Sequence, residues 1–342
     1  MPPGAGYREG VRAYRLLDNT IELSERDDPK PGPTGILIRV RAASINRRDL
    51  MLRDGTYPLP ARSGVVPLSD GAGEVVAVGA DVTRFTVGDR VTGSYWPRWR
   101  DGRLAPDLID QLGCTVDGMA TEYAVLDEQW AVRVPNHLTW AEAACLSCAG
   151  VTAWCSVTGS SVAAPGRTVL TLGSGDVSLF ALRFAKLLGC KVIVTTSDDT
   201  KATRLTALGA DHVINYRTTP RWGEAVQELT GGVDLVVETM GPETLPQSIT
   251  ATALHGEIVL LIWKAPGRPD LVIPGDVYGP KLATIRRLFV GSRTDLEAMT
   301  NAMSTHKLRP VIDQVFPFGA LPQAYQRFCS SERFGKVVIS DG

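Results

Sequence analysis

The sequence has little cysteine, little histidine and no long apolar run, and each shortage narrows the functions open to it. Six cysteines and four histidines are spread over 342 residues, so we expect reduced thiols in a cytoplasmic setting and no disulfide framework. No apolar stretch approaches the ~18 residues of a membrane span. Lysine and arginine (36) nearly balance aspartate and glutamate (37), which argues against nucleic-acid and membrane partners.

The length and the strand and helix patterns predict two domains. The first third is rich in valine, glycine and turns, with strands expected at 36–43 and 73–78 and a turn at 88–91. From about residue 140, strand patterns alternate with helix patterns, which predicts a doubly wound parallel sheet. The expected strands are 168–172, 191–195, 212–215, 233–238 and 256–262, and the expected helices are 177–188, 200–207, 221–229 and 243–250. A helix (294–304), a strand (311–316), a helix (321–329) and a strand (336–340) follow.

A glycine-rich turn joins the first of these parallel strands to its helix. Dinucleotide sites favour G-x-G-x-x-G/A at this place, because the glycines allow a tight turn and close approach of the pyrophosphate. The chain has two of the glycines and a small Ser178 in the third position. The candidate cofactor-binding residues here are Gly173, Ser174, Gly175, Asp176 and Val177. An ordinary strand–helix turn, with an acid that favours the helix dipole, is the alternative.

The next strand end distinguishes NAD from NADP. An acidic residue about 20 positions after the glycines would bind the ribose 2′-hydroxyl of NAD. The chain has Thr-Thr-Ser at 195–197 instead, and Ser197, Lys201 and Arg204 are suited to a 2′-phosphate. This pattern favours NADPH, although Asp198 and Asp199 oppose it.

Several blocks in order make the chain resemble the medium-chain dehydrogenases/reductases, in their zinc-independent branch with the quinone oxidoreductases. The blocks are "AASINRRDLMLRDGTYP" (42–58), "VPLSDGAGEVVAVGADVTRFTVGDRV" (66–91), "GVTAW" (150–154), "LGADHVINY" (208–216), "VGSR" (290–293) and "FGKVVI" (334–339). The resemblance implies a GroES-like β-rich catalytic domain (1–139 and 291–342) and a Rossmann domain (140–290). It also implies a homodimer that pairs through a strand near 284–290, and a small-molecule substrate.

The resemblance also bears on metal binding. Zinc-dependent relatives have a cysteine where this chain has Asn46, and a His-Glu pair where it has Ser69 and Asp70. Their structural-zinc lobe needs four closely spaced cysteines, and this chain offers only Cys114 there. Because thiolate and imidazole are missing, we expect no metal.

The resemblance further assigns candidate roles to single residues. Asn46, Tyr57 and Asp70 are the candidate catalytic residues, by hydrogen bonding to the substrate or by proton transfer. Thr152 matches a threonine at the nicotinamide, Lys336 a basic residue near the pyrophosphate, and Tyr216 a tyrosine beside the adenosine phosphate. Two tryptophans in a variable loop, Trp96 and Trp99, either wall the substrate cleft or form a small surface cluster.

These features predict an NADPH-dependent reductase that transfers hydride to an enone, quinone or carbonyl of a small apolar substrate. Two misfits leave an alternative open. Asp176 places a carboxylate where phosphates would lie, and Trp263 stands where relatives have glycine. Either the loop binds NADPH with Asp176 turned to solvent, or the fold serves a non-redox cyclase, isomerase or eliminating enzyme; a pure binding protein ranks third. The Cys145-x-x-Cys148 pair is interpreted as core packing.

Overall fold

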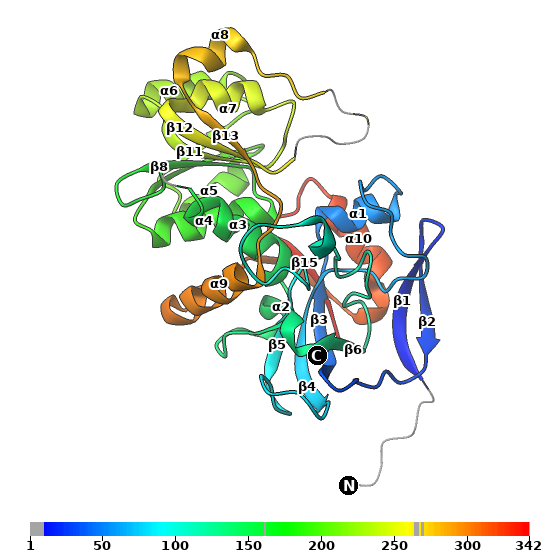
Figure 1. The fold of residues 1–342 in the computed structure, drawn as a ribbon. Coiled ribbons are helices and arrows are strands. Elements are labelled where there is room, and N and C mark those ends of the chain that lie inside the picture. Colours follow the sequence, from blue (N-terminus) through cyan, green and yellow to red (C-terminus); the bar gives the residue numbers. More distant parts are fainter. Residues whose placement is uncertain (1–9, 161, 263–266, 268–269, 342) are drawn as a thin grey trace.

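The computed structural model describes residues 10–160, 162–262, 267 and 270–341 (Figure 1). Its first element is an antiparallel hairpin of β1 (Val11–Leu17) and β2 (Thr20–Arg26). Two larger sheets follow, and they occupy separate regions of the molecule (Figure 1). Among the described residues, none of the helices has the length and hydrophobicity needed to cross a bilayer.

A seven-stranded sheet combines five strands that lie between residues 35 and 133 with the two C-terminal strands. Its order is β14-β15-β3-β4-β5-β7, with β6 paired to β3, and only β14 and β15 run parallel. The strands are β3 (Gly35–Ser44), β4 (Asp70–Val78), β5 (Arg90–Gly93), β6 (Tyr123–Asp127), β7 (Ala131–Arg133), β14 (Ile312–Phe316) and β15 (Lys336–Ser340). The C-terminal segment therefore places the start of β15 beside the carboxyl end of β3.

The second sheet has six parallel strands in the order β10-β9-β8-β11-β12-β13. They are β8 (Thr168–Leu172), β9 (Lys191–Thr196), β10 (His212–Asn215), β11 (Val233–Glu238), β12 (Thr252–Leu260) and β13 (Thr284–Arg287). Numbered within this sheet the order is 3-2-1-4-5-6, the doubly wound arrangement whose ligand crevice lies where the order reverses. The predicted parallel sheet is confirmed, and the strand predicted near 284–290 forms its edge.

The parallel sheet is covered on both faces because neighbouring residues of each strand point to opposite sides. Val169 packs into the core with α3 (Val151–Thr158), α4 (Asp176–Leu187) and α5 (Asp199–Ala207). Leu170 packs on the other face with α6 (Trp222–Thr230), α7 (Leu245–Ala251) and α8 (Gly275–Tyr278). This two-sided burial explains the unbroken apolar runs in the sequence.

The remaining helices connect or flank the two sheets. α1 (Arg47–Arg53) follows β3, and α10 (Leu321–Cys329) lies between β14 and β15. α2 (Trp140–Ala143) and a π-helical turn (Leu146–Gly150) lead into α3, while α9 (Arg293–His306) leads back from the parallel sheet. Short 3-10 turns lie at Pro106–Leu108, Glu128–Trp130, Gly279–Lys281 and Phe318–Ala320. One apolar core runs from the parallel sheet through these connections into the first domain.

Candidate cofactor loop and catalytic cluster

The glycine-rich loop lies at the carboxyl end of β8, next to the point where the strand order reverses. Gly173 makes the turn with a φ of +76°, a conformation that favours glycine. Gly175 has an ordinary φ of −77° at the N-cap of α4. A Cβ built on Gly173 meets no atom within 4 Å, and one on Gly175 meets only Arg333 Nη2 at 4.0 Å. Internal packing therefore gives no reason for glycine at 175, and the loop is open to close approach.

Asp176, the first residue of α4, forms an ion pair with Arg333. The carboxylate is buried, so the expected orientation of this side chain toward solvent is wrong. Arg333 Nη1 also donates to the carbonyl of Gly335 at 2.8 Å, and its guanidinium lies 4.1 Å from the ring centroid of Phe328. The sequence analysis missed Arg333, which directly precedes the block "FGKVVI".

The segment before β15 also contacts the candidate 2′-phosphate residues. The Lys201 ammonium is buried and donates a hydrogen bond to the carbonyl of Ser331. The Arg204 guanidinium lies 3.8 Å from the ring centroid of Phe334. The backbone of Gly335 donates to the carbonyl of Ser174 at 3.2 Å. This contact joins the glycine-rich loop directly to the segment that carries Lys336.

Two other candidate cofactor residues lie at the same edge of the parallel sheet. Ser197 directly follows β9. The backbone of Tyr216 donates to the carbonyl of Thr196 at 2.9 Å, and its side chain is exposed. Ser197 and Tyr216 therefore lie just beyond the ends of β9 and β10, and Lys201 lies in the first turn of α5.

A second group of candidates forms a buried cluster in the first domain. Lys336 begins β15, Asn46 caps α1 and Asp70 begins β4. The Lys336 ammonium donates to the carbonyl of Ile45 at 3.0 Å, to Asn46 Oδ1 at 2.8 Å and to Asp70 Oδ2 at 3.5 Å. Ser69 Oγ donates to the other carboxylate oxygen of Asp70 at 3.0 Å. The structure thus brings Asn46, Asp70 and Lys336 together.

The charge of Lys336 fixes the orientation of the Asn46 amide. Burial acts to lower the pKa of Lys336, but the carboxylates of Asp70 and Asp176 outweigh it and leave that pKa above its ordinary value. Because an ammonium can only donate, the atom of Asn46 that faces it must be the amide oxygen. The amide nitrogen, Asn46 Nδ2, is then a buried donor with no partner among the described residues. Such a donor is available to an acceptor on a bound molecule.

A buried acid supports Asn46 from its backbone side. Asp49 Oδ2 accepts a hydrogen bond from the Asn46 backbone N–H at 2.8 Å. Burial raises the pKa of Asp49 to about 6, against the opposing charge of Arg48, whose guanidinium lies 3.7 Å from the other carboxylate oxygen. Arg48 is itself held by the carbonyl of Leu112 at 2.6 Å. The start of α1 is therefore fixed by buried polar contacts.

Tyr57 belongs to a different set of contacts from Asn46 and Asp70. Its hydroxyl lies 2.9 Å from the Tyr95 hydroxyl, and both hydroxyls donate to Gln111 Oε1, at 2.8 and 2.9 Å. The Arg48 guanidinium lies 5.4 Å from the Tyr57 ring centroid and 5.0 Å from that of Tyr95. Burial raises the pKa of both phenols above an ordinary value that already lies well above neutral pH, so both are protonated there. Neither Tyr95 nor Gln111 carries a spacing signal that marks it in the sequence.

The two tryptophans of the variable loop, Trp96 and Trp99, have different environments. Trp96 is buried and packs against Tyr95 and Phe289, with both ring-centroid separations at 5.3 Å. Trp99 is partly buried and its indole N–H donates to the carbonyl of Gly102 at 3.0 Å. Phe289, which the sequence analysis did not select, is the partly exposed member of the Trp96 cluster. Trp263 lies outside the described residues.

The paired cysteines pack in the segment between α2 and α3 and are free thiols. Burial raises the pKa of Cys145 to about 12 and also raises that of Cys148. Both side chains are therefore protonated at neutral pH, as the packing interpretation expects. Thr152, one turn after Cys148, donates to that residue's carbonyl at 2.7 Å.

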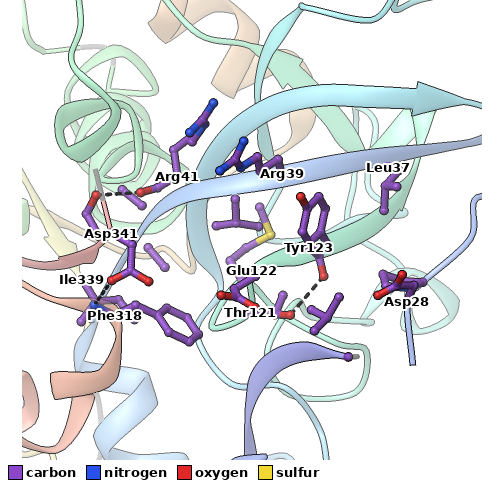
Figure 2. Close-up of a pocket in the computed structure, with 18 residues that line it drawn as sticks. Asp28, Leu37, Arg39, Arg41, Thr121, Glu122, Tyr123, Phe318, Ile339 and Asp341 are labelled. Carbon is purple, nitrogen blue, oxygen red and sulfur yellow. Dashed lines mark hydrogen bonds between the residues drawn. The ribbon is translucent and has the colours of Figure 1, made fainter. Parts of the chain in front are cut away.

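A cavity of about 670 Å³ lies elsewhere, on the seven-stranded sheet. Figure 2 shows it between Arg39 and Arg41 of β3, Tyr123 of β6 and Asp341 beyond β15. None of the candidate site residues lines this cavity. Within the described part of the chain, no group of three or more His, Cys, Asp or Glu side chains is placed to hold a metal ion.

Comparisons with known families match both parts of the chain. Residues 32–136 match the alcohol dehydrogenase GroES-like domain and residues 177–305 match the zinc-binding dehydrogenase family. A zinc-type alcohol dehydrogenase-like protein of Schizosaccharomyces pombe is 41% identical over 335 residues, covering 93% of this chain and 96% of that protein. The chain belongs to the medium-chain dehydrogenase/reductase superfamily, a superfamily of oxidoreductases. Its fold is the GroES-like domain with a Rossmann-like parallel sheet.

Solved structures agree with this assignment. An alcohol dehydrogenase from Sinorhizobium meliloti 1021 superposes with a TM-score of 0.91 at 37% identity, covering 98% of this chain and 99% of that chain. An NAD-dependent alcohol dehydrogenase has a TM-score of 0.87 at 32% identity, covering 97% and 100%. A zinc-binding dehydrogenase from S. meliloti, solved with NADP bound, shares the fold with a TM-score of 0.84 at 24% identity, covering 97% and 100%.

Proposed function

We propose that the protein is a zinc-independent, NADPH-dependent reductase that acts on a carbonyl, enone or quinone of a small apolar molecule. The observation that carries this proposal is the buried Asn46 amide, oriented by Lys336 so that its N–H groups remain available. We also propose the domain boundaries given above, 1–139 with 291–342 and 140–290.

The residues at the family's zinc position do not fit that metal. Asn46, Ser69 and Asp70 offer an amide, a hydroxyl and one carboxylate, whereas catalytic zinc favours thiolate and imidazole. The Lys336 ammonium already contacts Asn46 and Asp70. A divalent ion about 4 Å from an ammonium is repelled by about 8 kcal/mol at an effective dielectric of 20. The presence of the Lys336 ammonium at this position supports a reaction that needs no metal.

The glycine-rich loop fits a dinucleotide. Gly175 leaves open space at the N-terminus of α4, where unpaired N–H groups favour phosphate. Ser197, Lys201 and Arg204 at the end of β9 and in α5, with no carboxylate at 195–197, support NADPH over NADH. One similar structure is named NAD-dependent and a more distant one holds NADP, so the cofactor preference depends on this chain's own residues.

When bound, NADPH supplies the hydride. The chain's own residues then bind and polarise the acceptor. Asn46 Nδ2 donates to the substrate oxygen, on which negative charge develops as hydride arrives, and Lys336 holds the amide in that orientation. Tyr57, which is protonated at neutral pH like any phenol of raised pKa, is the candidate proton donor. The aromatic group of Tyr95, Trp96 and Phe289 supports an apolar substrate.

The non-redox alternative depended on the Asp176 charge and on Trp263. Arg333 pairs with Asp176, so the carboxylate is offset by an adjacent cation. This contact removes one of the two arguments for a lost cofactor site and favours the reductase.

Titration of the purified protein with NADPH and with NADH, followed by nicotinamide fluorescence, tests the proposal. We expect tighter binding of NADPH. Ser197→Asp should reverse the preference by introducing a carboxylate at the ribose position, while Thr206→Asp, near the far end of α5, should not. Equal or tighter NADH binding by the parent would contradict the cofactor choice, and failure to bind either nucleotide would contradict the function.

A further inference from the structure

Arg333 is held over the glycine-rich loop by two contacts on one of its nitrogens. Nη1 donates to Asp176 Oδ1 and to the carbonyl of Gly335. Nη2 lies 4.0 Å from the position that a Cβ on Gly175 would occupy. The ion pair therefore fixes a guanidinium directly above the start of α4.

The same guanidinium retains donors that the protein does not use. Among the described residues, no acceptor binds Arg333 Nε or Nη2. The side chain is 17% exposed, whereas that of its partner Asp176 is only 8% exposed. A planar guanidinium with free donors is suited to phosphate, which it binds through paired N–H groups.

Lys336, the residue that the family resemblance assigns to the pyrophosphate, is differently placed. Its three donors already meet three acceptors, Ile45, Asn46 and Asp70, and it is fully buried. The cation that faces the loop from the same segment is Arg333, three residues earlier.

We propose that Arg333, anchored by Asp176, binds the pyrophosphate of the dinucleotide. This inference rests on the proposed function, because it requires a pyridine nucleotide. It also gives Asp176 a role: the carboxylate holds the arginine at the loop, and the pair brings no net negative charge to the phosphates. Lys336 is then free to orient Asn46.

The test measures the dissociation constant of NADPH for Arg333→Met, Arg333→Lys and the double variant Arg333→Met/Asp176→Asn. We expect Arg333→Met to weaken binding about 10- to 100-fold, the range for loss of hydrogen bonds between charged groups. Arg333→Lys should weaken it less, because a point charge remains. The double variant should recover part of the loss, because it removes the carboxylate that Arg333→Met leaves unpaired beside the phosphates.

Two controls locate the effect. Arg167→Met removes an arginine–aspartate pair at the opposite end of β8 and should leave NADPH binding unchanged. Adenosine 2′-monophosphate has no pyrophosphate, so its affinity should change less than about twofold in Arg333→Met. Melting of each variant without nucleotide shows whether it is folded, and Arg333→Lys provides the comparison if the methionine variant is unstable.

The outcomes separate the two proposals. If the parent binds NADPH and Arg333→Met binds it equally well, Arg333 only fastens the C-terminal segment and the inference is wrong. If Arg333→Met weakens adenosine 2′-monophosphate as much as NADPH, the arginine acts at the other phosphate and the assignment is again wrong. If the parent binds neither NADPH nor NADH, the proposed function fails and this inference fails with it.

Discussion

The ammonium of Lys336 lies 2.8 Å from Oδ1 of Asn46, although the two residues are 290 positions apart in the sequence. The contact forms because β15 pairs with β3, so the first residue of one strand meets the residues that follow the other. An internal cation thus lies between Asn46 and Asp70.

Asn46→Ala should lower kcat/KM by about 100-fold, the usual effect of removing one donor to a developing oxyanion. The NADPH dissociation constant should stay the same, since Asn46 is expected to contact the substrate oxygen and not the nucleotide phosphates. Steady-state kinetics and fluorescence titration measure the two effects. Asn301→Ala, which alters an exposed asparagine of α9, is the matched control. Unchanged kcat/KM in Asn46→Ala would remove Asn46 from the proposed mechanism.

Lys336→Met should lower the free energy of unfolding by about 3–5 kcal/mol, because it leaves the Asp70 carboxylate buried without its cation. The double variant Lys336→Met/Asp70→Asn should recover much of this loss, since it removes the stranded charge. Urea denaturation of the parent, both variants and Asp70→Asn gives the free energies of unfolding for a double-mutant cycle. Additive losses in the double variant would show that the two side chains do not interact.

Asp49 should make the protein less stable as the pH rises through about 6. Its pKa is raised from 3.8 to about 6 in the folded protein, so the native state favours the neutral acid. The stabilising contribution is complete below about pH 4 and is lost above about pH 6, and its size is about 3 kcal/mol at about 1.4 kcal/mol per pH unit.

Urea denaturation at pH 4.0 to 7.5, compared between the parent and Asp49→Asn, measures this contribution because the variant cannot ionise. The difference in stability should move in favour of Asn as the pH rises. Asp107→Asn, at an exposed 3-10 turn, should follow the parent. Parallel curves for the parent and Asp49→Asn would show that Asp49 ionises normally.

The protein should be a homodimer. Among the described residues β13 forms the last strand of the parallel sheet, and a sheet edge is the kind of surface that proteins cover by pairing across a two-fold axis. Light scattering at micromolar concentration should give twice the 36.8 kDa chain mass. A monomer under these conditions would refute the prediction.

Local sequence patterns predicted the parallel sheet and its glycine-rich turn because each depends on residues close together in the chain. β12 begins at Thr252, although the sequence pattern predicts a strand from residue 256. The added residues pair with β11 in an irregular register, and His255 has a positive φ. The Asp176–Arg333 pair joins residues 157 positions apart, and no spacing rule predicts it. Tyr95 and Gln111 were missed for the same reason, since only the fold brings them to Tyr57.

Hydride transfer by metal-free protein is the most direct test of zinc-independent reduction. The protein would be treated with a chelator, shown by elemental analysis to lack zinc, and mixed with NADPH deuterated at the transferable position of the nicotinamide and with a small enone or aldehyde, in which the carbon that accepts the hydride keeps the label. If the protein is a zinc-independent reductase, deuterium will appear in the reduced product at the same rate as before chelation. Stoichiometric zinc in the purified protein, with transfer lost on its removal and regained on its return, would contradict it.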